Sequence, residues 1–123
     1  MLFFFFLTKG STNQMFLSTS HNKIDQKSRV SIPASYRLNL DKNNEQLILF
    51  KSLQFKCIEG TTQTRMQLYI NAIDELDGLS DEAFVLRMMM ADSFEIRYDS
   101  EGRITLPESL ISFSNIQDTA VFM

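Results

Sequence analysis

The sequence predicts an α+β domain in which one supersecondary unit is used twice. The segment from Asp25 to Ser35 (DQKSRVSIPAS) returns from Asp99 to Ser109 (DSEGRITLPES), at a constant offset of 74 residues. Each copy reads as strand, turn, strand and short helix, because alternating polar and apolar residues precede a proline. The chain has 123 residues, enough for one compact domain and few for two. The two copies are therefore expected to share one core.

The first copy predicts a hairpin whose loop spans Asp25 to Ser28, within the usual length of such connections. In the second copy, Gly102 stands before Arg103, where such a loop commonly needs a positive φ angle. Ser28 stands at the equivalent place in the first copy, and a left-handed conformation there costs about 1–2 kcal/mol for a residue with a Cβ. We expect the first loop to be strained or differently shaped.

Further elements follow from periodicity. Pro33 and Pro107 are expected at the first position of short helices, where the missing N–H costs nothing. Strands are predicted at residues 16–24, 46–51, 55–58 and 119–123. Between the copies, one helix carries an apolar face from Met66 to Leu76, and Ser80 caps a second. The side chains of this second helix expected to face inward are Phe84, Val85 and Met88.

The composition is that of a soluble globular protein, and it offers no catalytic or metal centre. Cys57 is the only cysteine and His21 the only histidine, so neither an internal disulfide nor a Cys/His zinc cluster can form. We interpret Cys57 as a buried structural thiol and His21 as a surface residue. No cofactor and no small-molecule substrate are expected, and the chain is not predicted to be an enzyme.

Charge is distributed unevenly along the chain. The net charge is −3, but residues 15–56 carry seven basic and three acidic side chains, whereas residues 57–123 carry four basic and twelve acidic ones. Local potential decides where a charged partner docks, so the first copy remains a candidate anion-binding face.

The chain begins with seven apolar residues, Met-Leu-Phe-Phe-Phe-Phe-Leu, too few to span a bilayer. No basic segment precedes them and no small-residue cleavage site follows, so neither a signal peptide nor a membrane partner is predicted. A second methionine, Met15, opens the segment Met-Phe-Leu-Ser-Thr. Residues 1–14 are therefore expected to be a non-core extension from a misassigned start codon, which retention of Met1 in the native protein would contradict.

The repeated Asp and Arg allow two interpretations. In the structural one, Asp25 accepts hydrogen bonds from turn amides and pairs with Arg29, although an exposed pair contributes only about 0–1 kcal/mol. In the functional one, the carboxylate orients a guanidinium that binds phosphates or guanine edges. The second copy has Glu101 where the first has Lys27, so the first copy is the better nucleic-acid surface. The basic residues expected around Arg29 are Lys23, Lys27 and Arg37, and Arg97 of the second copy matches Lys23.

These motifs resemble the MraZ family of bacterial transcriptional regulators. The resemblance runs from Met15 to Met123 and rests on Met15-Phe-Leu-Ser-Thr, on Asn22 to Arg37 and on Asp99 to Pro107. It implies an internally duplicated, AbrB-like swapped-hairpin (double-split) β-barrel with short helices and an inserted helical pair. The implied domains are a first motif at 15–60, a helical connection at 61–92 and a second motif at 93–123 that shares one barrel with the first.

The resemblance also implies a function. It indicates a sequence-specific regulator that binds double-stranded DNA at promoter repeats as a ring-like homo-oligomer, usually repressing the division and cell-wall gene cluster, in the cytoplasm at the nucleoid. By position, Lys23, Lys27, Arg29 and Arg37 would contact DNA, and Asp25, Asp99 and Arg103 would be motif residues with a structural role. Family members usually have Gly at position 28 and continue beyond position 123. The alternative is a protein-interaction module, either antitoxin-like or a truncated relative that does not regulate DNA.

Overall fold

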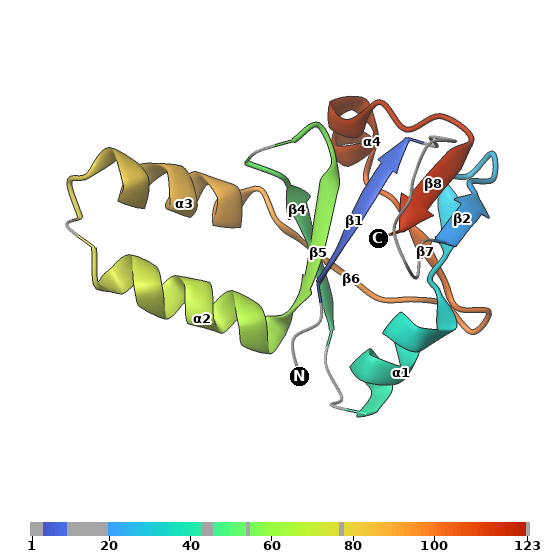
Figure 1. Ribbon diagram of the computed structural model, residues 1–123, viewed down its shortest axis with the longest axis horizontal. Coiled ribbons are helices and arrows are strands. Elements are labelled where there is room, and N and C mark those ends of the chain that lie inside the picture. The colour runs from blue at the N-terminus through green and yellow to red at the C-terminus, as the bar shows by residue number, and fades with distance from the viewer. Residues whose placement is uncertain (1–3, 10–19, 43–45, 54, 77, 123) are drawn as a thin grey trace.

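The computed structural model describes residues 4–9, 20–42, 46–53, 55–76 and 78–122. This part of the chain contains four helices and two antiparallel sheets, which confirms the α+β class (Figure 1). None of its helices is long and apolar enough to cross a membrane. The elements are β1 (Phe4–Lys9), β2 (Ser20–Lys23), β3 (Arg29–Ser31), α1 (Ala34–Lys42), β4 (Leu47–Lys51), β5 (Ile58–Thr62), α2 (Gln63–Asp74), α3 (Asp81–Ala91), β6 (Phe94–Ile96), β7 (Arg103–Thr105), α4 (Glu108–Ser114) and β8 (Thr119–Phe122).

The larger sheet has six strands in the order β2-β8-β1-β5-β4-β6, and the smaller sheet pairs β3 with β7. The described strands do not close into a barrel, so the double-split barrel is not reproduced as a closed form. β1 lies inside the larger sheet, where Leu7 pairs with Ile58 of β5 and with Phe122 of β8. The prediction that residues 1–14 are non-core is therefore wrong for Phe4–Lys9, because a run of apolar residues forms a central strand; residues 10–14 lie outside the described residues.

The two hairpins are interleaved. β3 of the first copy does not pair with a strand of its own copy along its length, but with β7 of the second copy. Two backbone hydrogen bonds extend this pairing: the N–H of Ile32 donates to the carbonyl of Gly102, and the N–H of Leu106 donates to the carbonyl of Ser28, both at 2.9 Å. The repeated sequences thus build one shared structure, as their similarity predicted.

Both prolines lie two residues after the end of a strand and immediately before a helix. Pro107 is the N-cap of α4, with an extended backbone (φ −60°, ψ 141°), and α1 begins at the residue after Pro33. The carbonyl of Pro107 accepts hydrogen bonds from Leu110 and Ile111 at 3.1 Å, so it closes the first turn from outside the helix. The prolines therefore lie one position earlier than the first helical position that we expected, since each must also continue the preceding extended segment.

The predicted strands at 46–51 and 119–123 are observed as β4 and β8. The predicted strand at 55–58 is wrong, because β5 begins at Ile58 and Phe55 is exposed in the connection. Ser52 begins this connection, with its N–H donating to the carbonyl of Cys57 at 3.0 Å. The predicted strand at 16–24 is observed from Ser20 to Lys23, and residues 16–19 lie outside the described residues.

One apolar core joins both copies. Its centre consists of Val30 and Ile104, which face each other across the smaller sheet and are each 1% exposed. The ring of Tyr36 on α1 packs at an edge-on angle of 60° against Phe122 of β8, with the ring centroids 6.1 Å apart. The other buried members of this core are Ile32, Leu40, Leu47, Leu49, Ile58, Leu106, Leu110, Ile116 and Ala120. The core fixes the position of each hairpin relative to the other.

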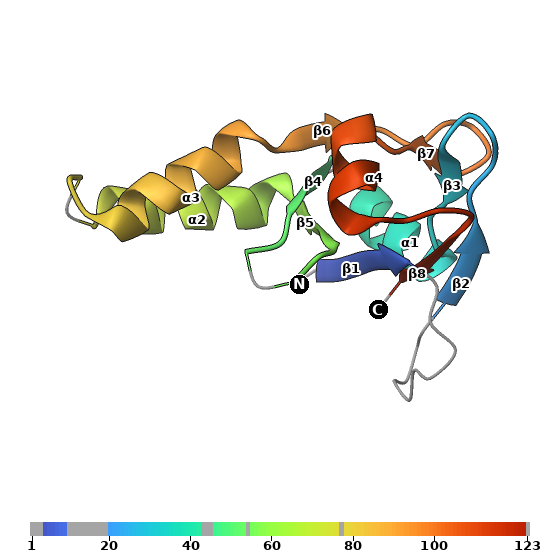
Figure 2. The same cartoon turned by 90° about the horizontal axis from the view of Figure 1, so that it is seen from above.

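Helices α2 and α3 form an antiparallel pair, the helical arm (residues 63–91), which extends away from the sheet at the end opposite the hairpins (Figures 1 and 2). Ser80 caps α3 as predicted, since its hydroxyl accepts a hydrogen bond from the N–H of Ala83 at 3.2 Å. The inward orientation predicted for Phe84, Val85 and Met88 is wrong. They are 63%, 46% and 49% exposed, because α3 instead turns the small side chain of Ala83 inward.

Candidate nucleic-acid interface

The first hairpin is organised by the carboxylate of Asp25. Its Oδ1 accepts hydrogen bonds from the backbone N–H groups of Lys27 and Arg29, both at 2.9 Å. Its Oδ2 accepts from Arg29 Nε at 2.7 Å, which is also an ion pair. One carboxylate therefore closes the turn and holds one edge of a guanidinium, as an Asp at a turn is suited to do.

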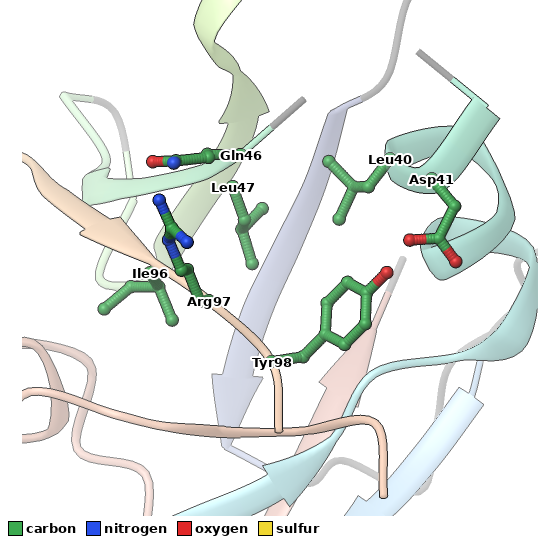
Figure 3. A pocket seen from close by; sticks show the side chains of 7 residues that line it. All are labelled: Leu40, Asp41, Gln46, Leu47, Ile96, Arg97 and Tyr98. Carbon is green, nitrogen blue, oxygen red and sulfur yellow. The ribbon is translucent and has the colours of Figure 1, made fainter. Parts of the chain in front are cut away.

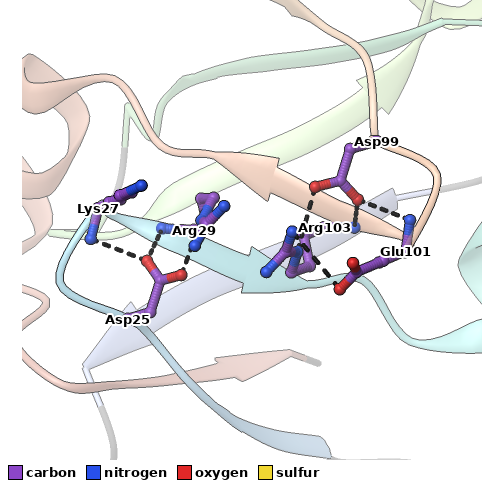
Figure 4. Close-up of polar contacts among 6 residues, drawn as sticks. All are labelled: Asp25, Lys27, Arg29, Asp99, Glu101 and Arg103. Carbon is purple, nitrogen blue, oxygen red and sulfur yellow. Dashed lines mark hydrogen bonds and ion pairs between the residues drawn. The ribbon is translucent and has the colours of Figure 1, made fainter.

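The second hairpin repeats the same contacts around Asp99. Its Oδ1 accepts from the N–H groups of Glu101 and Arg103 at 2.9 and 3.0 Å, and its Oδ2 accepts from Arg103 Nε at 3.1 Å. Figure 4 shows the two Asp–Arg pairs flanking the β3–β7 ribbon. The structural interpretation of the motif thus describes both copies, because each Asp satisfies the amides of its own turn.

These hydrogen bonds lower the pKa of both aspartates. For Asp25 the largest contribution is the hydrogen bond from the backbone N–H of Arg29, and for Asp99 it is that from Arg103. Hydrogen bonds to the ionised form favour that form, so both carboxylates stay charged well below neutral pH. Both aspartates therefore remain ion-paired with their arginines across the physiological pH range.

The two arginines differ in the number of carboxylates beside their guanidinium groups. Arg103 Nη2 lies 3.5 Å from Glu101 Oε2, so a second carboxylate faces this guanidinium. In the first copy Lys27 stands in place of Glu101. Within the described part of the chain, the Nη atoms of Arg29 make no hydrogen bond or ion pair, and the side chain is 31% exposed. Arg103 thus has a second carboxylate close to its guanidinium, and Arg29 has only that of Asp25 among the described residues.

The exposed cations beside Arg29 are Lys23, at the end of β2, and Lys27, in the loop. We call Lys23, Lys27 and Arg29 the basic hairpin surface. Asn22 braces this surface, because its Nδ2 donates to the carbonyl of Ser31 at 2.7 Å and so ties β2 to β3. Asn22 was missed at the sequence level, although its polar side chain in a strand beside the motif was a signal.

Arg37 does not extend the basic hairpin surface as expected. Its Nε donates to the carbonyl of Ile32 at 3.2 Å, and its guanidinium lies against Gly102 of the other copy. A Cβ added at Gly102 would lie 2.6 Å from Arg37 Nη1. Arg37 thus packs where α1 meets the second hairpin, and its guanidinium would have to shift to make room for a side chain at position 102.

Ser28 has the same backbone conformation as its counterpart Gly102 in the second copy. Its φ is 63°, in the left-handed region, and the φ of Gly102 is 76°. In both loops this residue donates its N–H to the aspartate carbonyl, at 3.1 Å for Ser28 and 3.0 Å for Gly102. The expectation of a strained first loop is confirmed, and the alternative of a different shape is not, since the hydrogen bonds match.

The remaining candidate residues are Cys57 and His21. Cys57 is buried, and burial raises the pKa of its thiol, as expected for a structural cysteine. His21 is exposed on β2. No three His, Cys, Asp or Glu side chains gather into a metal site within the described ranges.

A cavity of about 430 Å³ lies between α1 and the strands β4 and β6 (Figure 3). With the Gln46 amide assigned so that its oxygen faces Arg97, this oxygen accepts a hydrogen bond from Arg97 Nη2 at 2.6 Å and the amide nitrogen donates to Glu95 Oε1. Arg97, the counterpart of Lys23, therefore contacts Gln46 of the first copy. The cavity is lined by Leu40, Asp41, Gln46, Leu47, Ile96, Arg97 and Tyr98, and contains none of the residues of the basic hairpin surface.

No family model matches the chain. Among curated proteins, the chain is 34% identical over 111 residues to the transcriptional regulator MraZ of Pelagibacter ubique (strain HTCC1062), covering 89% of this chain and 72% of that protein. The proteins of the same name from Rickettsia canadensis (strain McKiel) and Rickettsia rickettsii (strain Sheila Smith) are 34% and 35% identical over 111 residues, which cover 74% of each. The chain belongs to the MraZ family of transcriptional regulators.

Proposed function

We propose that this chain is a sequence-specific DNA-binding regulator that docks the basic hairpin surface on double-stranded promoter repeats. It acts as a ring-like homo-oligomer at the nucleoid, in the cytoplasm, and represses the division and cell-wall gene cluster. The proposal rests on family membership together with one structural difference: Arg29 pairs with one carboxylate among the described residues, whereas Arg103 pairs with two.

Arg29 has the chemistry that base recognition requires. Asp25 holds its Nε edge, which fixes the plane of the guanidinium and leaves the Nη nitrogens for a ligand. Two adjacent N–H donors match the O6 and N7 acceptors of guanine or two oxygens of a phosphate. A pre-oriented guanidinium also loses less conformational entropy on binding, so Arg29 is the residue that we assign to base recognition.

Lys23 and Lys27 have a different task. Both are exposed and flank the hairpin, so they suit contacts with phosphates that position the protein without reading sequence. The second hairpin presents Glu101 instead of Lys27, and its carboxylate would repel a phosphate. Arg37, packed against Gly102, supports the hairpin arrangement and is assigned no contact with DNA.

The interleaved hairpins support an AbrB-like architecture. The reciprocal backbone hydrogen bonds of Ile32 and Leu106 exchange contacts between the copies, as a swapped-hairpin unit does. We assign the first motif to residues 15–60, the helical connection to 61–92 and the second motif to 93–123. We add Phe4–Lys9 to the second motif because this segment pairs with β8. The double-split barrel is the arrangement that we propose for the assembled protein.

Assembly compensates for the weak charge of each subunit. A single chain has a net charge of −3, so one basic hairpin surface would bind DNA weakly. Several such surfaces on one face of a ring would bind repeated sites together, because the later contacts form at a high effective concentration. The exposed apolar side chains of the helical arm offer the subunit contact. They are Leu68, Leu79, Phe84, Val85 and Met88.

The same exposed side chains favour the second candidate, a protein-interaction module without DNA regulation. Contiguous exposed apolar side chains mark surfaces that bind another protein. The two candidates differ in their ligand, because the interaction module would use the helical arm and leave the basic hairpin surface without a partner.

One binding series tests the proposal. The full chain is titrated against a duplex from its own upstream region and a scrambled duplex of equal composition, by gel shift at several salt concentrations, with its mass measured by size exclusion. We expect a multimer that prefers the upstream duplex, with affinity falling steeply as salt rises. Equal binding to both duplexes, or no binding at low salt, would contradict the proposal.

A further inference from the structure

The larger sheet contains an internal symmetry that the sequence repeat describes only in part. Leu47 of β4 pairs with Ile96 of the edge strand β6, and Ala120 of β8 pairs with Asn22 of the edge strand β2. Asn22 and Ile96 are equivalent positions of the repeat, separated by the same 74 residues as Asp25 and Asp99. Leu47 and Ala120 are therefore structural counterparts, and β8 is the β4 of the second half.

On its other side, each of these strands has a further neighbour. Leu47 pairs with Thr62 of β5, which follows β4 directly along the chain. Its counterpart Ala120 pairs with Lys9 of β1, which comes from the N-terminal end. The next two pairs keep the same register. Ile48–Thr61 in the first half corresponds to Val121–Thr8 in the second. Leu49–Gly60 corresponds in the same way to Phe122–Leu7. β1 thus lies in the second half where β5 lies in the first.

The contact between β1 and β5 tests this equivalence independently. If the two strands are related by a twofold axis, Leu7 corresponds to Gly60 and Phe5 to Ile58. Rotation about this axis should then turn the pair Phe5–Gly60 into the pair Ile58–Leu7, and both pairs are present. Phe6 and Glu59 are counterparts of each other and are paired, so the axis passes between them.

The smaller sheet has the same symmetry. The twofold axis relates the pair Arg29–Thr105 to the pair Arg103–Ser31. Val30 pairs with its own counterpart, Ile104. Both sheets therefore follow one relationship between the halves. The first half is β2, β3, α1, β4 and β5, and the second half is β6, β7, α4, β8 and β1.

We infer that the gap between β5 and β8 is a strand-binding site whose ligand is the chain's own segment Phe4–Lys9, which is apolar from Phe4 to Leu7. We call this gap the fifth-strand site, because its occupant completes the second half. An unoccupied site would leave an open edge on each of two strands, beside the fully buried Ile58 and Phe122. The segment binds antiparallel to both neighbours, so main-chain hydrogen bonds on its two edges supply the recognition.

Occupation of this site has a structural consequence for the hairpins. β8 also pairs with β2, and β2 ends at Lys23, where the first hairpin begins. The segment Phe4–Lys9 therefore stabilises the sheet that carries the basic hairpin surface. This inference concerns the fold and does not rest on the proposed function, and each test below is made without DNA.

A disulfide tests the register directly. Lys9→Cys and Ala120→Cys are introduced together in a Cys57→Ala background, because directly paired residues of antiparallel strands lie within disulfide range. The control is Lys9→Cys with Thr119→Cys, since adjacent residues of a strand point to opposite faces. We expect the first variant to form an intramolecular disulfide under mild oxidation, as a reduction-sensitive monomer band, and the control to form several-fold less. Cross-linked dimers, or equal yields from both variants, would overturn the inference.

Proline substitution tests whether occupation stabilises the fold. Leu7 pairs with both neighbouring strands, so Leu7→Pro removes an N–H from a central strand, whereas Thr12→Pro lies outside Phe4–Lys9. We expect the urea midpoint of Leu7→Pro to fall clearly below that of Thr12→Pro, or Leu7→Pro not to fold while Thr12→Pro does. Hydrogen exchange of the unmodified chain gives a second measurement. Amides of residues 5–9 should be protected like those of β8, and exchange at the rate of an unstructured segment, or equal midpoints for the two proline variants, would overturn the inference.

Discussion

Ser28 and Gly102 adopt the same left-handed conformation at equivalent positions of two hairpins, with φ angles of 63° and 76°. Each donates its N–H to the carbonyl of the aspartate three residues earlier, and each accepts a backbone hydrogen bond from the other copy at 2.9 Å. Serine is thus held in a conformation that costs about 1–2 kcal/mol for residues with a Cβ. The interleaved hairpins impose this geometry regardless of the residue present.

This pair predicts opposite responses to substitution. Ser28→Gly should raise the free energy of unfolding by about 0.5–1 kcal/mol, because relief of the left-handed strain exceeds the greater entropy of glycine in the unfolded chain. Gly102→Ala should lower it by about 1–2 kcal/mol, since alanine acquires the strain and its Cβ meets Arg37. Urea unfolding of the two variants measures both effects. Destabilisation by Ser28→Gly would show that the loop is not strained.

The lowered pKa of Asp25 predicts how its contribution varies with pH. Its folded pKa lies below the ordinary value of 3.8, so the stabilisation is present above that value and is lost as pH falls through the folded pKa. The difference in unfolding free energy between the native chain and Asp25→Asn should therefore stay constant from neutral pH to about pH 4 and shrink below it. Asp41→Asn, at an exposed carboxylate on α1, is the control. A difference that shrinks already between pH 7 and 5 would contradict this assignment.

Glu59 should behave in the opposite way. Burial raises its pKa above the ordinary 4.5, and a hydrogen bond with the side chain of Ser52 only partly offsets this effect. Because the folded pKa is the higher one, the favourable contribution exists below about pH 4.5 and is lost as pH rises through the folded value. Glu59→Gln should then be more stable than the native chain at pH 7 and equal to it near pH 4. Thermal unfolding at both pH values measures this, and a stability loss at pH 7 would refute the prediction.

The helical arm should decide assembly. Phe84 and Met88 lie four residues apart on one face of α3 and are 63% and 49% exposed. Replacing both by Ser should reduce the mass found by size exclusion while leaving the circular dichroism spectrum unchanged, because neither side chain belongs to the core. Glu82→Ser, also exposed on α3, should leave the mass unchanged. A double variant that retains the native mass would show that subunits meet elsewhere.

Much of this structure follows from local sequence signals. The repeat of Asp25 and Arg29 at Asp99 and Arg103 predicts two equivalent hairpins, and the shared context of Pro33 and Pro107 predicts the helices after them. These signals suffice because a turn and a helix start are set by residues a few positions apart.

Long-range placement could not be predicted in the same way. The run from Phe4 to Leu7 is apolar, but the pairing of Phe4–Lys9 with β5 and β8 depends on a symmetry that only the folded sheet displays. The same limit applies to charge. Lys51 and Lys56 counted toward the basic first half, yet their Nζ atoms lie over the ring of Phe113 on α4, at 5.6 and 4.7 Å from its centroid.

Arg37 shows the same limit at the candidate site. Arg37 lies eight positions after Arg29, which suggested one basic cluster, but a helix begins between them at Ala34. The helix directs the guanidinium of Arg37 to Gly102. Sequence distance therefore misjudged which cations share a surface.

The most direct test of the account compares Arg29→Ala with Arg103→Ala, because the two side chains make matching contacts with their aspartates and differ in their outward Nη atoms. The measurement is the dissociation constant for the upstream duplex at one fixed salt concentration. We expect Arg29→Ala to weaken specific binding by about tenfold or more, as the loss of one base-reading arginine does, and Arg103→Ala to have little effect. Equal losses in the two variants, or unchanged binding by Arg29→Ala, would contradict the central claim that the first hairpin reads DNA.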